Sequence, residues 1–281
     1  ADVLTVFART DGGRHVALLV ESSMDGFEVG QRYGTMGLAG NDLRHLHFND
    51  VRVPPENVLG EEGDGFRVAT QVLNIGRMSL GSGSAGSVRR LMSLALEHTE
   101  QRHQFDQPLA EFELVQQKVA WMATYLYGME AMSYLTTGLV DRGVTDFRLE
   151  SAVLKVAGTE FLWYAANRVF QLAGGQAYMT DQPYEKMLRD IRVFPIFEGA
   201  NDVMRLFVAL DGLKTLGDEL EGLMSLSPRR PVRSATAVTA YATGRVQRTF
   251  SPDQLCGVHP ALATRAKAVA GQVRDFRGAA E

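Results

Sequence analysis

One carboxylate, Glu198, lies between an apolar run and the start of a predicted helix. Pro195 disfavours helical geometry at the residue before it, and Gly199 provides backbone freedom directly after the carboxylate. From position 203 onward, apolar residues recur at three- and four-residue spacing, which predicts an amphipathic helix. A carboxylate at such a helix entrance is suited to act as a general base, or alternatively it caps its own helix. We expect three apolar side chains to crowd it: Phe194, Ile196 and Phe197.

Arg102, Gln104 and Phe105 end the first long predicted helix. A guanidinium presents forked donors that match phosphate, and a phenylalanine ring offers an apolar face to a planar group. The alternative is that Arg102 only stabilises the negative end of its helix.

Gln171, Gly174 and Gly175 close another predicted helix. Paired glycines at a helix end are typical of a C-cap. No GxGxxG follows a predicted strand, so the sequence gives no support for a Rossmann domain that would bind NAD or flavin.

Asn74 and Arg77 are one helical turn apart, so their side chains share a face. Taken alone, such a pair is an ordinary surface feature of a helix.

The segment 189–192, RDIR, followed by 196–202, IFEGAND, resembles the signature of the acyl-CoA dehydrogenases. The resemblance runs from Ala1 to about Leu216 and is closest to the very-long-chain branch. It implies that Glu198 removes the α-proton of an acyl-CoA thioester while the β-hydrogen leaves as hydride to the N5 atom of FAD. It also implies that the thioester carbonyl binds the backbone amide of Glu198 and a ribityl hydroxyl. The FAD contacts implied by the resemblance are Arg102, Gln104, Phe105, Gln171, Gly174, Gly175, Ala200, Asn201 and Asp202, and the acyl-CoA contacts are Asn74, Arg77 and Gly199.

The function implied is FAD-dependent α,β-dehydrogenation of fatty acyl-CoA to trans-2-enoyl-CoA in fatty acid β-oxidation. The implied electron acceptor is an electron-transferring flavoprotein, and the implied assembly is a homodimer or a dimer of dimers. Two alternatives stay open: a non-catalytic scaffold or assembly protein that reuses the dehydrogenase bundle, and an acyl-CoA oxidase. Asp106, Ala177 and Ala200 stand where the family commonly has Gly, Gly and Thr, which favours the scaffold, whereas the complete motif around Glu198 favours catalysis.

The composition is that of an ordinary globular protein, with 281 residues of which 45% are hydrophobic and 22% charged. The net charge of −4 gives no reason to expect nucleic acid as a partner. The single cysteine, Cys256, suits a reducing compartment, so we expect the bacterial cytoplasm or the mitochondrial matrix rather than secretion. The six histidines lack the spacing of a zinc site, so no metal is expected. No run of about 18 apolar residues predicts a membrane-spanning helix.

The elements that must position these residues begin with strands at 3–10 and 14–21, joined by an Asp-Gly-Gly turn, and continue with strands at 27–33 and 43–53. We expect one four-stranded sheet. Helices follow at 66–102, 111–142, 147–174 and 184–194, and another opens after Glu198. The small-residue tract Gly81–Gly86 predicts close approach of another helix or a ligand, or else a flexible break.

The predicted fold class is therefore α+β, with a partial antiparallel β-domain at 1–62 and an antiparallel helical bundle at 63–220 that carries Glu198. Residues 221–281 read as an Arg-rich linker followed by the start of an extra helical domain, with a helix at 259–276. This tail could contact a membrane surface or a partner, although a solvated linker is favoured. In the family, further strands and an all-helical domain precede the position of Ala1, so we expect the chain to be the C-terminal part of a longer enzyme.

Overall fold

The computed structural model describes residues 1–224, 239, 243 and 260–280. The chain forms two compact units, Ala1–Arg205 and Leu206–Glu281. All the candidate site residues belong to the first unit. The predicted domain boundaries after residues 62 and 220 stay predictions. Cys256 and the Arg-rich stretch of the tail lie outside the described residues.

The first unit opens with the predicted hairpin. Strand β1 (Val3–Arg9) pairs antiparallel with β2 (His15–Glu21), and Gly13 takes the positive φ of 77° that the tight turn requires. A short strand, β5 (Val58–Leu59), pairs with the other edge of β2 and completes a three-stranded sheet in the order β1-β2-β5.

The prediction of a single four-stranded sheet is wrong. Strands β3 (Phe27–Arg32) and β4 (Arg44–Phe48) form a separate two-stranded sheet, and β4 is much shorter than the predicted 43–53. Every residue of β4 is exposed, and in β3 only Phe27 and Gly30 are partly buried. The apolar side chains of the second hairpin pair with one another, Phe27 with Phe48 and Val29 with Leu46, and three of these four stay exposed, so they do not join it to β1 and β2.

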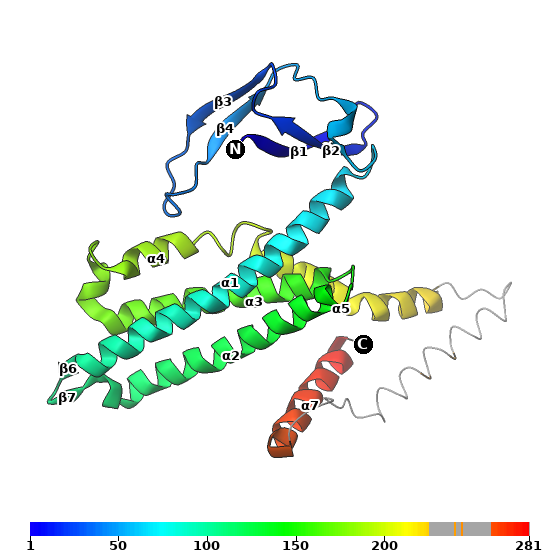
Figure 1. Cartoon of the computed structure of the whole chain (residues 1–281). Coiled ribbons are helices and arrows are strands. Elements are labelled where there is room, and N and C mark those ends of the chain that lie inside the picture. The colour runs from blue at the N-terminus through cyan, green and yellow to red at the C-terminus, as the bar shows by residue number, and fades with distance from the viewer. Residues whose placement is uncertain (225–238, 240–242, 244–259, 281) are drawn as a thin grey trace. The chain divides into compact units, whose positions relative to one another are not determined.

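The helical part confirms the predicted α+β class and consists of long antiparallel helices (Figure 1). A hairpin of two-residue strands, β6 (His103–Gln104) and β7 (Gln107–Pro108), joins the first two helices. Short 3-10 helices are η1 (Pro55–Asn57), η2 (Leu109–Glu111) and η3 (Gly174–Tyr178). Helix α4, of nine residues, ends before the predicted 194. The helices are α1 (Gly65–Gln101), α2 (Glu113–Asp141), α3 (Arg148–Ala173), α4 (Pro183–Ile191) and α5 (Asn201–Met224).

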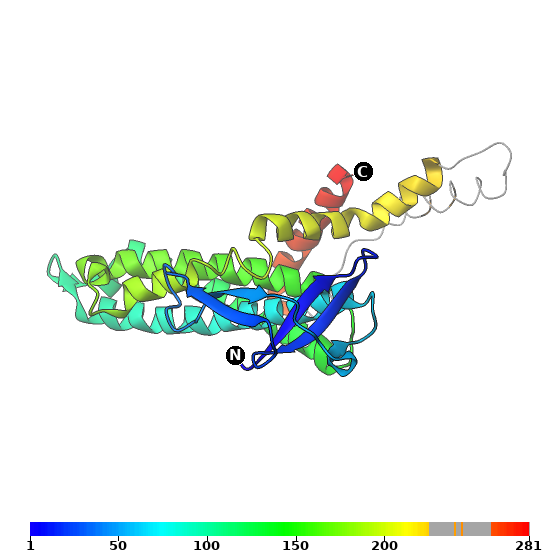
Figure 2. The same cartoon turned by 90° about the horizontal axis from the view of Figure 1, so that it is seen from above.

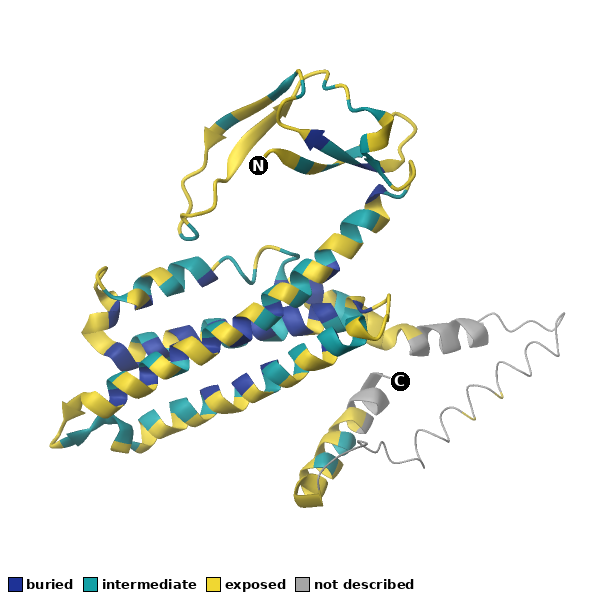
Figure 3. Ribbon diagram, viewed as in Figure 1, coloured by how far each residue is buried: buried dark blue, intermediate teal, exposed yellow. Residues whose placement is uncertain are grey.

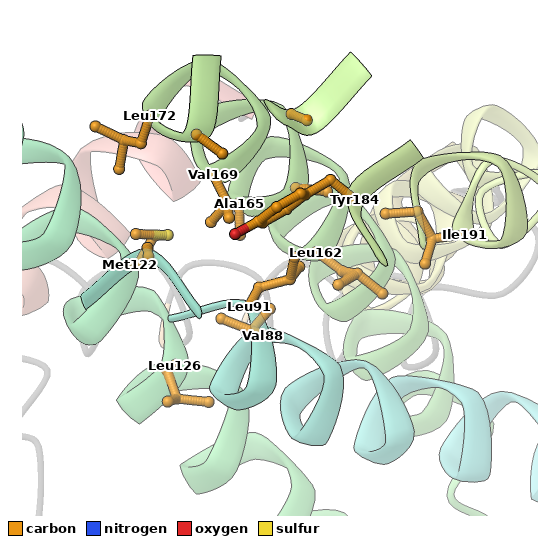
Figure 4. Close-up of a cluster of buried hydrophobic side chains, with 14 of the residues drawn as sticks. Val88, Leu91, Met122, Leu126, Leu162, Ala165, Val169, Leu172, Tyr184 and Ile191 are labelled. Carbon is orange, nitrogen blue, oxygen red and sulfur yellow. The ribbon is translucent and has the colours of Figure 1, made fainter. Parts of the chain in front are cut away.

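Helix α3 lies at the centre of the core and is the most deeply buried helix, whereas the outer face of α2 is exposed (Figure 3). Apolar side chains from α1, α2 and α4 pack on it (Figure 4). Full burial of one such Leu or Met side chain contributes about 1.5–3 kcal/mol. The central members of this cluster are Val88, Leu91, Met122, Leu126, Leu162, Ala165, Val169, Leu172, Tyr184 and Ile191.

The small-residue tract in α1 marks a close helix contact and not a break, because α1 is continuous from Gly65 to Gln101. A Cβ on Gly81 would lie 2.6 Å from Cγ of Leu154 and 2.8 Å from its carbonyl oxygen. A Cβ on Gly158 would likewise lie 3.0 Å from the carbonyl oxygen of Gly81. Glycine at both positions therefore lets α1 and α3 approach at backbone distance.

In the second unit, η4 (Pro260–Leu262) and α7 (Ala263–Ala280) confirm the helix predicted near the end of the chain. Across the described ranges, no helix is long and apolar enough to cross a membrane.

Candidate functional site

The chain between α4 and α5 is a compact turn that ends in left-handed backbone. Backbone N–H groups of Ile196 and Phe197 both donate to the carbonyl of Val193, and the N–H of Asn201 donates to the carbonyl of Pro195 at 2.9 Å. Glu198 has a φ of 57° and Gly199 a φ of 93°. A non-glycine residue in this region costs on the order of 1–3 kcal/mol and persists only where its surroundings hold it. Such strain is common at functional sites.

The carboxylate of Glu198 faces Gly76 of α1. A Cβ on Gly76 would lie 2.8 Å from Oε2 and 2.9 Å from Oε1, so the missing side chain provides the space that the carboxylate occupies. Atom Oε2 is buried and has no hydrogen-bond partner among the described residues. A helix cap would accept a backbone N–H, so the alternative of Glu198 as a cap is wrong.

The predicted crowding of Glu198 by three apolar side chains is only partly right. Phe194 packs against the core, but Ile196 is 55% exposed and Phe197 38% exposed. These two apolar side chains are partly exposed to solvent. The group that lies against the carboxylate is instead the backbone of α1 at Gly76.

Arg77 and Asn74 share a helix face, as predicted, and the alternative of a surface pair is wrong. Asn74 is buried, and its Oδ1 accepts a hydrogen bond from Nη1 of Arg77 at 3.2 Å. Nε of Arg77 donates to the carbonyl of Glu198 at 2.9 Å. Burial lowers the pKa of Arg77, and the charge of Glu198 opposes that shift.

Lys155 of α3 completes the surroundings of the turn, and sequence reasoning missed it. Its side chain is fully buried, and Nζ donates to the carbonyl of Gly199 at 2.7 Å and to Oδ1 of Asn201 at 2.6 Å. Burial lowers the pKa of Lys155 to about 8, helped by the neighbouring positive charge of Arg77, while Glu198 and Glu160 raise it.

Asn201 begins α5 and is buried within this polar cluster. Its Nδ2 donates to Oγ1 of Thr159 at 3.0 Å and to Oε1 of Glu160 at 3.2 Å, while Oδ1 accepts from Lys155. Both donors and the acceptor of this amide are therefore used inside the chain. Its neighbours differ: Ala200 is half-buried and the side chain of Asp202 is exposed.

Three successive backbone amides of the turn lack an acceptor among the described residues. Within the described part of the chain, the N–H groups of Glu198, Gly199 and Ala200 donate no hydrogen bond. Unpaired amides beside a buried carboxylate form a donor set suited to an oxygen that gains negative charge.

Arg102 is the C-cap of α1, and Gln104 and Phe105 lie on the β6–β7 hairpin that follows it; all three residues are exposed. The two residues of its turn, Phe105 and Asp106, have φ values of 52° and 64°, as in a type I′ hairpin. Aspartate tolerates this left-handed region, which accounts for Asp106 at a position where glycine is common in the family. Phe105 is 87% exposed, so its ring is available to a ligand or partner.

Gln171, Gly174 and Gly175 are exposed at the end of α3. Gly174 ends the helix with a φ of 59°, which confirms the predicted C-cap. In both views this helix end lies at the same end of the bundle as β6 and β7 (Figures 1 and 2). Arg102 is ~37 Å along α1 from Arg77 at 1.5 Å per residue. The structure therefore gathers the candidates into two groups, one around Glu198 and one at the hairpin end.

A second contact missed by sequence reasoning joins the β3–β4 hairpin to α4. The backbone N–H of Leu38 donates to Oδ1 of Asp190 at 2.7 Å, and Nη1 of Arg189 donates to the carbonyl of Met36 at 2.8 Å. A Cβ on Gly37 would lie 2.4 Å from the carbonyl oxygen of Arg189, so the loop lies directly on the helix. Helix α4 leads straight into the turn that carries Glu198.

Comparison with known proteins agrees with this arrangement. The family model described as "Acyl-CoA dehydrogenase, C-terminal domain" matches residues 63–212. The chain belongs to the acyl-CoA dehydrogenase family. It is 36% identical over 289 residues to the mitochondrial very long-chain specific acyl-CoA dehydrogenase of Homo sapiens, covering 98% of this chain and 44% of that protein. It is 34% identical to a probable acyl-CoA dehydrogenase of Bacillus subtilis, covering 89% of this chain and 49% of that protein.

A solved acyl-CoA dehydrogenase from Bacillus anthracis, described as complexed with FAD, has a similar fold. The TM-score is 0.79 at 31% sequence identity, over 98% of this chain and 47% of that one. The chain thus spans about half the length, or less, of the relatives that it matches.

Proposed function

We propose that this chain carries the base-bearing part of an enzyme that dehydrogenates fatty acyl-CoA thioesters to trans-2-enoyl-CoA, with FAD as cofactor, in fatty acid β-oxidation. The observation that carries the proposal is the Glu198 carboxylate, whose buried Oε2 has no hydrogen-bond partner among the described residues. A buried acceptor without a partner is rare in a folded protein and indicates a ligand or a catalytic role.

In this proposal Glu198 accepts the proton from Cα of the thioester. The developing negative charge moves to the thioester oxygen, and in this proposal the backbone amide of Glu198, which donates no hydrogen bond among the described residues, donates one to that oxygen. Nε of Arg77 donates to the carbonyl of Glu198 at 2.9 Å and thereby fixes the plane of the peptide group between Glu198 and Gly199. Arg77 lies beside the base, since it donates to the carbonyl of Glu198 and to Oδ1 of Asn74, and a Cβ on Gly199 would lie 3.4 Å from its Nη2. This position beside the base supports the proposed contact of Asn74, Arg77 and Gly199 with acyl-CoA.

The residues at the hairpin end fit an FAD site. Arg102 offers a fork of donors to phosphate, and the exposed Phe105 offers an apolar face. The exposed ends of Gln171, Gly174 and Gly175 allow close approach of a ligand to the backbone. Bound FAD would accept the hydride from Cβ of the substrate.

The separation of the two groups supports a homodimer or a dimer of dimers. About 37 Å along α1 separates Arg77 from Arg102, and we propose that one FAD does not reach both groups of the same chain. We propose that the hairpin end of one subunit holds the cofactor that serves Glu198 of another. Near the base, Ala200, Asp202 and the backbone of Asn201 remain for flavin contact, because the Asn201 side chain is fully hydrogen-bonded within the chain.

The proposed electron acceptor is an electron-transferring flavoprotein, and the proposed compartment is the mitochondrial matrix or the bacterial cytoplasm, as the two relatives suggest. The acyl-CoA oxidase alternative predicts that oxygen is consumed during turnover without any acceptor protein. Asp106 in place of glycine was one argument for the scaffold alternative. Its left-handed backbone, with a φ of 64°, is one that aspartate tolerates, so this argument no longer favours the scaffold.

The test is visible absorbance of the purified protein with added FAD, followed by anaerobic addition of palmitoyl-CoA. We expect a flavin spectrum that bleaches, and in Glu198→Gln a flavin spectrum that persists. Protein that takes up no FAD, or FAD that never bleaches in the parent, contradicts the proposed dehydrogenation.

A further inference from the structure

Lys155 is a buried cation that the proposed proton transfer does not use. Lysine is almost never fully buried unless it is paired, yet no atom of this side chain reaches solvent. Its Nζ contacts no carboxylate at ion-pair distance in the described part of the chain; it donates instead to two neutral oxygens, the carbonyl of Gly199 and Oδ1 of Asn201. Lys155 therefore carries a buried charge, which is energetically unfavourable, and its hydrogen bonds go to the turn that carries Glu198 and to the residue that begins α5.

The two hydrogen bonds from cations act on consecutive peptide groups. Arg77 donates to the carbonyl of Glu198 and Lys155 to the carbonyl of Gly199. In a planar trans peptide the N–H points opposite to the C=O. Drawing both carbonyls toward α1 and α3 therefore turns the N–H groups of Gly199 and Ala200 away from these helices, and neither N–H has a partner among the described residues.

These hydrogen bonds also hold the left-handed backbone of the turn. Glu198 keeps a φ of 57°, which an isolated chain would leave for the ordinary right-handed or extended regions. Lys155 ties the turn to α3 at Gly199 and fixes the start of α5 through Asn201.

We propose that protonated Lys155 is a positioning residue for dehydrogenation, which acts through the Gly199 carbonyl to hold the Glu198 carboxylate and the turn amides in their reactive arrangement. This inference rests on the proposed function. The charged groups that act on the ammonium are Arg77 from α1, Glu160 from α3 and Glu198 from the turn itself. A neutral amine would lose the charge-assisted hydrogen bonds to both oxygens.

The first experiment measures anaerobic flavin reduction by palmitoyl-CoA in the FAD-loaded protein, for the parent, Lys155→Met and Arg205→Met. Arg205 is the matched control because it is a cation of the same cluster, 2.5 Å from Glu160, that touches neither Gly199 nor Asn201. We expect Lys155→Met to lower the limiting rate about 10- to 100-fold, with little change in the acyl-CoA concentration for half-maximal rate. Arg205→Met should leave both quantities unchanged.

The second measurement is the pH profile of the same limiting rate. In the parent and in Arg205→Met the rate should fall as the pH passes about 8, where Lys155 loses its proton, whereas the residual rate of Lys155→Met should lack this fall. If Lys155→Met does not fold, the parent profile decides: a fall near pH 8 supports the positioning role, and a flat profile overturns it.

A third readout does not depend on turnover. Amide hydrogen exchange in the segment 194–203 should be faster in Lys155→Met than in the parent, and unchanged in Arg205→Met. If the parent never reduces its flavin, the proposed function fails while hydrogen exchange still decides whether Lys155 holds the turn. A folded Lys155→Met protein with the parental reduction rate, or with parental exchange in this segment, overturns the inference.

Discussion

Gly76→Ala should separate activity from stability clearly. The new Cβ would lie 2.8–2.9 Å from the carboxylate atoms of Glu198. Ordinary carbon contacts are ~3.5 Å, so the carboxylate must retreat by about 0.5–1 Å. A misplacement of this size costs up to about 100-fold in rate, and we expect flavin reduction by acyl-CoA to slow by about 10- to 100-fold.

The same change should hardly affect folding. The carboxylate is the free end of a flexible side chain and moves at low cost, while alanine in a helix interior is more favourable than glycine by about 0.5–1 kcal/mol. We therefore expect the free energy of unfolding in urea to stay within about 1 kcal/mol of the parent value.

Gly83→Ala is the matched control for this experiment. Gly83 lies on the same helix, α1, and a Cβ there meets nothing within 4 Å. It should gain the same helix preference and keep the parental reduction rate. A Gly76→Ala protein that reduces its flavin as fast as Gly83→Ala would refute the role of Gly76 in making room for the base.

Three further outcomes follow from the same structure. Gly81→Ala should lower the free energy of unfolding by about 1–3 kcal/mol, because its Cβ would lie 2.8 Å from the backbone carbonyl of Leu154; urea unfolding at the parental value would contradict the close helix contact. Asp190→Ala removes the acceptor of the Leu38 N–H, so limited proteolysis should cut the loop after β3 sooner while the bundle stays resistant. The pKa of Lys155 is about 8 in the folded protein and 10.5 in the unfolded chain, so between these pH values the unfolded chain binds the extra proton. As the pH rises from 8 to 10.5, the free energy of unfolding of the parent should therefore increase relative to that of Lys155→Met by on the order of 3 kcal/mol. A constant difference across that range would contradict the burial of the charge.

The helices could be predicted from the sequence because their apolar periodicity is long and regular. Helix α3 runs from Arg148 to Ala173, against a predicted 147–174, and α1 from Gly65 to Gln101, against 66–102. The sheet could not be predicted in the same way. Pairing of β2 with β5 joins segments of which one has only two residues, too short to carry a pattern of its own.

The site was predicted where a motif is contiguous and missed where its parts are distant in sequence. Local spacing singled out Glu198 at a helix entrance and the shared face of Asn74 and Arg77, while the role of Glu198 as a base came from the resemblance and stays a proposal. Lys155 was missed because its partners, Gly199 and Asn201, lie 44 and 46 residues away. A signal was present, since Lys155 follows Ser151 and precedes Thr159 at helical spacing on the buried face of α3. A charged residue on such a stripe indicates a buried partner, but no local pattern names that partner.

Gly76 was missed for a related reason. A glycine inside a helix shows only that a side chain is absent, and the carboxylate that fills the space belongs to a turn far along the chain. Only the folded arrangement of α1 against that turn reveals what the glycine accommodates.

The most direct test of the central claim, that Glu198 removes the α-proton, is proton exchange at Cα without hydride transfer. The FAD-loaded protein would be incubated in deuterated water with an acyl-CoA whose β-position carries no transferable hydrogen, and loss of the α-hydrogen signal would be followed by NMR. We predict exchange in the parent and a rate at least about 100-fold lower in Glu198→Gln. Equal exchange rates in the two folded proteins would show that another group is the base.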